Sequence, residues 1–69
     1  MTTKTVSVPG INCGHCVMTI EREVGEMAGV SEVKASHESK DVTVSWNPET
    51  TEWSAIRDLM VEINFPPAE

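Results

Sequence analysis

Two cysteines near the N-terminus carry the clearest chemistry in this sequence. Cys13 and Cys16 are the only cysteines, and they stand in the run GINCGHC at residues 10–16. Thiolates are nucleophiles and soft metal ligands, so the C-x-x-C spacing predicts either metal binding or thiol–disulfide chemistry. The elements on either side decide how the pair is presented.

The motif stands where a predicted strand meets a predicted helix. Residues 2–8 alternate between apolar and polar, a proline and a glycine at residues 9–10 stop the strand, and helical spacing begins at Val17. We therefore expect Cys13 in a loop and Cys16 in the first helical turn. Unpaired backbone N–H groups and the positive end of the helix dipole favour the thiolate there.

Three readings of the cysteine pair are weaker than metal binding. Attachment of a c-type haem is excluded, because Val17 and not a histidine follows Cys16. A thiol–disulfide catalyst is the second reading, since Cys-Gly-His-Cys looks like the active site of protein disulfide isomerases. A thioredoxin-like domain, however, needs a longer chain and a tryptophan where Asn12 stands. Two incidental surface cysteines form the third reading, and surfaces usually avoid exposed free thiols.

Metal binding fits the pair better. Two thiolates are too few for a closed structural zinc site, which takes four ligands, but they suit a soft monovalent ion such as Cu(I). An open coordination shell would let a partner's thiolates attack the metal and take it over. His15 lies between the cysteines and is a candidate third ligand, although we expect its side chain to be exposed and unliganded. Gly10 and Gly14 are expected to let the backbone turn tightly.

The rest of the chain alternates between helical and strand patterns. A first amphipathic helix is predicted from Val17, with Gly29 as its end. Its core-facing positions are Val17, Ile20, Val24 and Met27. Residues 30–36 and 41–46 alternate as strands and are joined by a polar turn at residues 38–40, which predicts a hairpin.

A second helix and a weak edge strand complete the pattern. Thr50 or Thr51 is the predicted N-cap, and Asn64 the left-handed residue at the C-terminal end. The predicted inward positions are Trp53, Ile56, Leu59 or Met60, and Ile63. Residues 65–69 give at most a short edge strand, because their prolines cannot donate to a ladder. This order predicts an α+β fold, the ferredoxin-like βαββαβ sandwich, with two helices on one face of an antiparallel sheet.

The length, net charge and residue types of the chain exclude several classes of function. The 69 residues allow a single domain, residues 1–69, and 11 acidic against 5 basic residues give a net charge of −6. That balance opposes nucleic acid and membrane surfaces and suits a protein partner with a basic patch. No apolar run could span a membrane, no signal peptide is visible, and the free cysteines favour the cytoplasm. We see no carboxylate pair and no nucleophile–base constellation, so we do not expect an enzyme.

The cysteine run and the helix after it resemble the heavy-metal-associated domain family, which includes small copper chaperones and N-terminal domains of copper-transporting P-type ATPases. The resemblance extends to residues 28–33 and 56–65. It implies Cu(I) bound by Cys13 and Cys16 and passed to a similar domain, such as that of a metal-transporting P-type ATPase. It also implies a monomer, which a shared metal ion could bridge into a dimer. A detached ATPase domain and a carrier of Hg(II), Cd(II) or Zn(II) remain alternatives.

Two positions depart from the family's pattern. Ile11 replaces the usual methionine, and we expect it to serve equally as a buried anchor of the loop. Phe65 stands where the family often has tyrosine or lysine, so apolar cover would replace a polar group near the metal. With Asn12, Gly14 and His15, these two residues are the predicted surroundings of the metal ligands.

Overall fold

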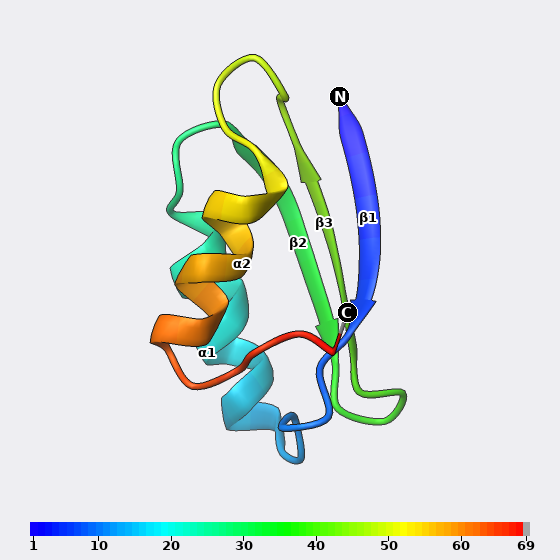
Figure 1. Cartoon of the computed structure of the whole chain (residues 1–69). Helices are drawn as coiled ribbons and strands as arrows, with labels where there is room; N and C mark the ends of the chain where they lie inside the picture. The colour runs from blue at the N-terminus through cyan, green and yellow to red at the C-terminus, as the bar shows by residue number, and fades with distance from the viewer. Residues whose placement is uncertain (69) are drawn as a thin grey trace.

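The computed structural model describes residues 1–68 and contains two helices packed on one face of an antiparallel sheet (Figure 1). In chain order the elements are β1 (Thr2–Ser7), α1 (Gly14–Gly25), β2 (Val30–Ser36), β3 (Asp41–Trp46) and α2 (Trp53–Glu62). The sheet order within these residues is β1-β3-β2. The small α+β architecture confirms the predicted fold class. The helices of the described chain, α1 with 12 residues and α2 with 10, are both too short to span a membrane.

The core lies between the sheet and the helices. Central strand β3 alternates strictly, and its inward residues Val42, Val44 and Trp46 are all buried. The remaining buried apolar residues are Val6, Val8, Ile11, Ile20, Val24, Ile56 and Met60. The opposite face of the sheet is polar and carries cross-strand hydroxyl contacts, Thr3 to Ser45 at 2.9 Å and Thr5 to Thr43 at 2.8 Å. One face is therefore packed and the other is solvated, as is common in antiparallel sheets.

The predicted last strand is reduced to a single bridge in the part of the chain described. The Ala68 N–H donates to the Ser7 carbonyl at 2.7 Å, pairing the two residues antiparallel. Pro66 and Pro67 have no N–H to continue the ladder. Glu69, the end of the predicted segment, lies outside the described residues.

Two predicted boundaries differ from the structure. The first strand ends at Ser7 rather than Val8, whose N–H donates to the Lys40 carbonyl at 2.8 Å. Helix α1 ends at Gly25, not at Gly29. Gly29 instead has a left-handed φ of +90° in the turn that leads into β2. This turn is hydrogen-bonded to the loop that follows β3, because the Gly29 carbonyl accepts from the Asn47 N–H at 2.7 Å.

The predicted threonine cap of α2 is wrong. The N-cap is Glu52, which makes no side-chain cap hydrogen bond. Thr50 and Thr51 belong to the preceding turn, where their N–H groups donate to the Asn47 carbonyl at 3.0 and 3.1 Å. The Asn47 side chain also accepts from the Glu49 N–H at 3.0 Å. Asn47 therefore organises this turn, and Thr51 and Thr50 lie one and two residues before the N-cap position.

Candidate metal site

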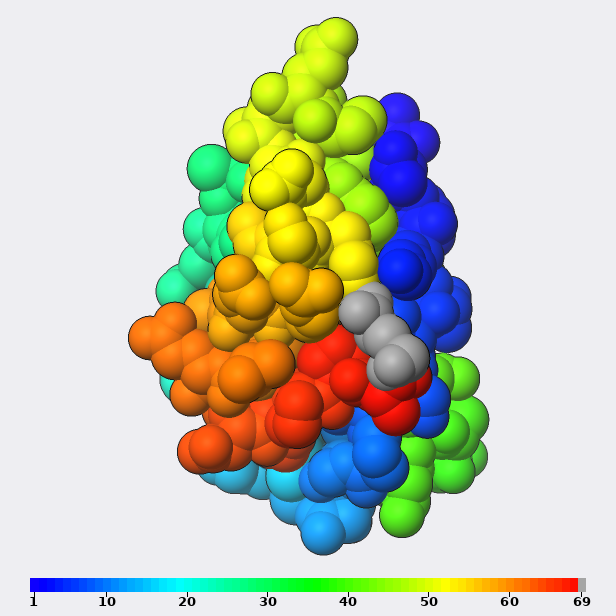
Figure 2. All heavy atoms as spheres, in the orientation of Figure 1, coloured from blue at the N-terminus to red at the C-terminus, as the bar shows by residue number. Residues whose placement is uncertain are grey.

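The cysteine loop is pinned to the core at its start. The Ile11 N–H donates to the Val8 carbonyl at 3.1 Å, and Val8 is in turn held by Lys40. Val8 and Ile11 are both fully buried. Ile11 therefore anchors the loop as expected, and the residues after it emerge at the surface. In Figure 2 this segment, coloured light blue, occupies one end of the molecule, next to the C-terminal segment.

Cys13 and Cys16 lie together at the junction of loop and helix. Cys13 is the N-cap of α1 with an extended backbone, and Cys16 is in the first turn, as predicted. The first helical hydrogen bond runs from the Val17 N–H to the Cys13 carbonyl at 3.4 Å. Both thiols are free, Cys13 is exposed and Cys16 half-buried, and the two Sγ atoms are 3.1 Å apart. One soft ion could reach both sulfurs from the solvent side.

The surroundings of Cys13 favour its thiolate. The hydrogen bond from the Cys16 thiol is the largest effect that lowers the pKa of Cys13, followed by the backbone N–H groups of Cys16 and then His15. Partial desolvation opposes them. These N–H groups act by their orientation at the start of the helix, since the Cys13 side chain makes no cap hydrogen bond. The site therefore presents a ready sulfur ligand.

Asn12 faces the second sulfur. The Cys16 Sγ lies 3.7 Å from the Asn12 Oδ1, a long contact in which the thiol is the donor. Cys16 has a single S–H, so it can donate to Asn12 or to Cys13 but not to both at once. The shorter contact, to Cys13, is the one that stabilises a thiolate.

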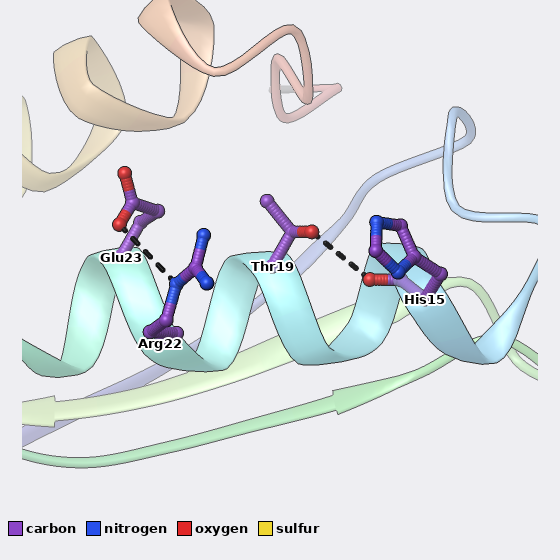
Figure 3. Close-up of polar contacts among 4 residues, drawn as sticks. All are labelled: His15, Thr19, Arg22 and Glu23. Atoms are coloured by element: carbon purple, nitrogen blue, oxygen red, sulfur yellow. Dashed lines mark hydrogen bonds and ion pairs between the residues drawn. The ribbon is translucent and has the colours of Figure 1, made fainter.

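His15 lies in the first turn of α1 with an exposed side chain. Its backbone carbonyl accepts from the Thr19 hydroxyl at 3.0 Å, and Figure 3 shows the imidazole projecting from the helix surface beside this contact. In residues 1–68 no group of three or more His, Cys, Asp or Glu side chains is placed to share an ion. In this part of the chain the two cysteine sulfurs therefore form a pair and not part of a larger group of such side chains. His37 lies in the turn between β2 and β3.

Phe65 is brought to the loop by the end of α2. Asn64 has the predicted left-handed conformation, with φ of 70°. The Phe65 N–H donates to the Met60 carbonyl at 2.8 Å and the Asn64 N–H to the Val61 carbonyl at 3.1 Å, which is the Schellman pattern. The half-buried Phe65 ring then packs on the core, and its Cδ1 lies 3.8 Å from where a Cβ at Gly10 would stand.

The glycines of the loop do not work as expected. Within residues 1–68 Gly29 is the one glycine with positive φ, so neither Gly10 nor Gly14 provides a left-handed turn. Gly10 lies beneath Phe65, and Gly14 is the first residue of α1. The sequence also did not predict the backbone hydrogen bond from the Val8 N–H to the Lys40 carbonyl. A turn residue with φ of 56°, as Lys40 has, is not signalled by a lysine.

Comparison with known proteins places the chain among metal-binding domains. The family profile "Heavy-metal-associated domain" matches residues 5–66. The chain is 35% identical over 69 residues to the copper chaperone CopZ of Bacillus subtilis, covering all of both chains. It is 34% identical over 61 residues to copper-transporting ATPase 1 of Rattus norvegicus, covering 88% of this chain but only 4% of that protein.

A more distant relative and a solved structure complete the comparison. The periplasmic component of the mercuric transport protein of Pseudomonas aeruginosa is 28% identical over 64 residues, 93% of this chain and 70% of that one. The solution structure of apo-CopP from Helicobacter pylori superimposes with a TM-score of 0.86 at 33% identity, covering 97% of this chain and 100% of that one.

Proposed function

The chain belongs to the heavy-metal-associated domain family, and we propose that it is a metallochaperone-like carrier of one Cu(I) ion. The observation that carries the proposal is the pair of free sulfurs, 3.1 Å apart, at an exposed corner of the molecule. Cys13 and Cys16 would be the ligands and Cu(I) the cargo. Each thiol gives up its proton as the metal binds, because only thiolate sulfur is a strong ligand.

The donor set favours Cu(I) over harder ions. Two thiolates form a soft site, and soft ligands select Cu(I) among the first-row metals. With two protein ligands the ion keeps an open position, so a partner's thiolate can bind before Cys13 or Cys16 leaves. The metal then changes ligands through a three-sulfur intermediate, with no change of oxidation state and without release of the free ion.

The names of the relatives support delivery to another protein. CopZ is named a copper chaperone and matches this chain from end to end. The copper-transporting ATPase matches over 4% of its length, so its transport activity does not carry over, but such a protein contains a similar domain. We propose a metal-transporting ATPase or a related metal-binding domain as the partner, the cytoplasm as the location, and a carrier without catalytic activity.

Hg(II) is the second candidate cargo. The mercuric transport protein shares 28% identity over most of this chain, and mercury is also a soft ion that two thiolates hold well. Either metal ion would be held by the same two ligands, Cys13 and Cys16.

Anaerobic titration tests the assignment of ligands and metal. We expect one Cu(I) per chain when copper is supplied from a strong competing chelator, with the mass of the complex read by native mass spectrometry. Cys13→Ser and Cys16→Ser should each lower the affinity severely and leave the circular dichroism spectrum unchanged. Ser31→Cys, on the polar side of β2, is a control for adding a thiol elsewhere. Undiminished binding by either serine variant would refute the assignment, and tighter retention of Hg(II) in the same competition would favour the second cargo.

A further inference from the structure

Strand β1 is an edge strand, and its backbone groups point alternately toward β3 and away from it. The Val8 N–H, one residue past the strand, donates to the Lys40 carbonyl at 2.8 Å and continues the ladder between β1 and β3. Every second residue before Val8 therefore directs its N–H and C=O groups to β3. These inward residues are Thr2, Lys4 and Val6.

The residues between them direct their backbone groups outward. The Ala68 N–H, from the C-terminal segment, donates to the Ser7 carbonyl at 2.7 Å on this outer side. The bridge does not extend further within residues 1–68, so the N–H and C=O groups of Thr3 and Thr5 have no backbone partner there. In Figure 1 the C-terminal segment meets the end of β1 and leaves the rest of this edge uncovered. Such a row of unpaired groups is a template for another strand.

The opposite edge of the sheet is protected against an added strand. On β2 the Glu21 carboxylate accepts from the Ala35 N–H at 3.1 Å, and the register shifts between Val30 and Glu32. A bulge and a charged group on the edge backbone are both devices that prevent strands from pairing edge to edge. Over residues 2–7 β1 shows neither, because its register with β3 runs without a shift and its outer backbone groups are open.

The N-terminal part of the chain is free of acidic residues. All 11 of them lie at Glu21 or beyond, and the only Lys or Arg in residues 1–20 is Lys4. The Lys4 Nζ lies over the Trp53 ring, 4.7 Å from its centroid, on the helix side of the sheet. Two copies that each carry a net charge of −6 therefore repel one another least where they meet through β1.

We propose that two copies of this chain pair through their β1 edges, antiparallel and about a two-fold axis at Thr3. Each Thr3 N–H donates to the Thr3 carbonyl of the second copy, and each Thr5 pairs with Met1 of the second copy. The two three-stranded sheets join into one, in the order β2-β3-β1-β1-β3-β2. The pairing needs neither a cysteine nor a metal ion, so this inference does not rest on the proposed function.

The side chains favour this register. On the open face of the sheet it places the two Thr3 side chains against one another and prolongs the hydroxyl row in which Thr3 contacts Ser45 at 2.9 Å. Threonine pairs across neighbouring strands stabilise a sheet. On the helix side it places Lys4 opposite Thr2 of the second copy, so like charges do not face one another directly.

Two other registers are unfavourable. An axis at Lys4 would set two ammonium groups opposite each other, which destabilises a strand pair. An axis at Thr5 would bring Thr3 of the second copy to the Ser7 carbonyl, which the Ala68 N–H already occupies. The register at Thr3 uses residues 1–5 and leaves the Ala68 bridge intact. A contact this short gives a weak dimer, below the size of a stable interface.

The paired edges leave the two cysteine sites uncovered. Figure 1 places the N-terminal end of β1 at the end of the molecule opposite the loop that precedes α1. In an antiparallel pair about Thr3, the two cysteine loops therefore lie at opposite ends of the dimer. Metal loading and dimer formation are then separate properties of the chain.

Charge substitutions at Thr3 test the axis. The background is the Cys13→Ser/Cys16→Ser double variant, in which neither a disulfide nor a shared metal ion can join two chains. Sedimentation velocity over micromolar to millimolar concentrations measures association. Thr3→Lys and Thr3→Glu, each alone, set like charges against each other and should weaken the dimer several-fold. Mixed one to one, they should associate more tightly than either alone.

Matched controls come from the other edge strand. Ser31 is an exposed hydroxyl residue of β2, as Thr3 is of β1. Ser31→Lys and Ser31→Glu change the net charge of the chain in the same way as the Thr3 variants. Their one-to-one mixture should associate with the mean strength of the two, with no recovery from the mixing itself.

Thr3→Pro tests the hydrogen bonds of the pairing. Proline removes the outward N–H and breaks no bond to β3, a position that edge strands tolerate. Two hydrogen bonds at the axis are lost, so association should weaken about tenfold. Thr3→Val keeps the N–H and should stay within a few-fold of the parent protein.

Amide hydrogen exchange followed by NMR identifies the paired strand. As the concentration rises, exchange of the Thr3 and Thr5 amides should slow several-fold, whereas the Lys4 amide, already bonded to β3, should not change. A chain that stays monomeric up to millimolar concentration would overturn the proposal and leave this edge to a strand of another protein. Protection of the Ala35 amide on β2 in place of Thr3, or equal effects of charge at Thr3 and Ser31, would overturn it as well.

Discussion

The ring of Phe65 lies against the backbone of Gly10, with 3.8 Å between the Phe65 Cδ1 and the place of a Cβ at Gly10. The end of α2 thus covers the loop that carries Cys13. We expect Phe65→Ala to speed metal exchange with a chelator, or thiol oxidation by air, more than it lowers the equilibrium affinity for Cu(I). Stopped-flow competition and a timed thiol assay measure the two rates. Phe65→Leu, which keeps an apolar cover, is the control, and unchanged rates in Phe65→Ala would show that the ring only fills the core.

Asn64 sets the position of Phe65 through its left-handed backbone. At φ of 70°, Asn64→Ala should destabilise the fold by about 1 kcal/mol, whereas Asn64→Gly should be neutral or slightly stabilising. Urea unfolding followed by tryptophan fluorescence measures both. Equal stabilities of the alanine and glycine variants would contradict this account of the helix end.

The Cys13 thiolate depends first on its neighbour. Because the Cys16 thiol is the leading cause of the lowered pKa of Cys13, Cys16→Ala should raise the pKa of Cys13 toward that of an ordinary thiol. Thiolate forms above the pKa, so the pH profile of Cys13 alkylation by iodoacetamide should move to higher pH in the variant. A depressed folded-state pKa favours the folded protein above the unfolded pKa, and this contribution is lost as the pH falls through the folded value. An unshifted profile would assign the effect to the backbone N–H groups alone.

Gly29 cannot be replaced without strain. Its φ is +90°, and a Cβ there would stand 2.8 Å from the Thr50 Cβ. Gly29→Ala should cost about 2 kcal/mol or more, from the backbone conformation and the clash together. Gly25→Ala, in open space at the end of α1, is the control and should not destabilise. Thermal unfolding compares the two, and equal melting temperatures would show that the turn can relax.

The strands of the hairpin were predictable to the residue, whereas the ends of the helices were not. Residues 41–46 alternate without interruption, and residues 30–36 alternate from Val33 onward, after a shift in register between Val30 and Glu32. The side-chain period of a strand leaves little freedom in placing such segments. At the end of α1 the spacing of apolar residues does not show where the helix stops. After Gly25 the chain continues in tight turns, with Met27 bonded to the Val24 carbonyl at 3.1 Å. Met27 still packs on the core, so its apolar period extends past the true helix end.

Within the site, the sequence predicts what local spacing controls. The loop position of Cys13, the first-turn position of Cys16 and the left-handed Asn64 all follow from neighbouring residues. The contacts made by tertiary structure do not. The Lys40 carbonyl accepts from the Val8 N–H across a separation of more than thirty residues, and a lysine side chain gives no sequence signal for such a backbone contact. The open space at Gly14 likewise depends on what the rest of the chain leaves uncovered.

Delivery of copper to another protein can be measured in one mixing experiment. Cu(I)-loaded protein is combined anaerobically with the soluble metal-binding domain of a copper-transporting ATPase, in the presence of a small-molecule chelator that competes for free copper. We expect copper to reach the acceptor domain faster than it dissociates into the chelator, at a rate that rises with acceptor concentration. Transfer no faster than spontaneous dissociation, and independent of acceptor concentration, would show that the protein stores copper and does not deliver it.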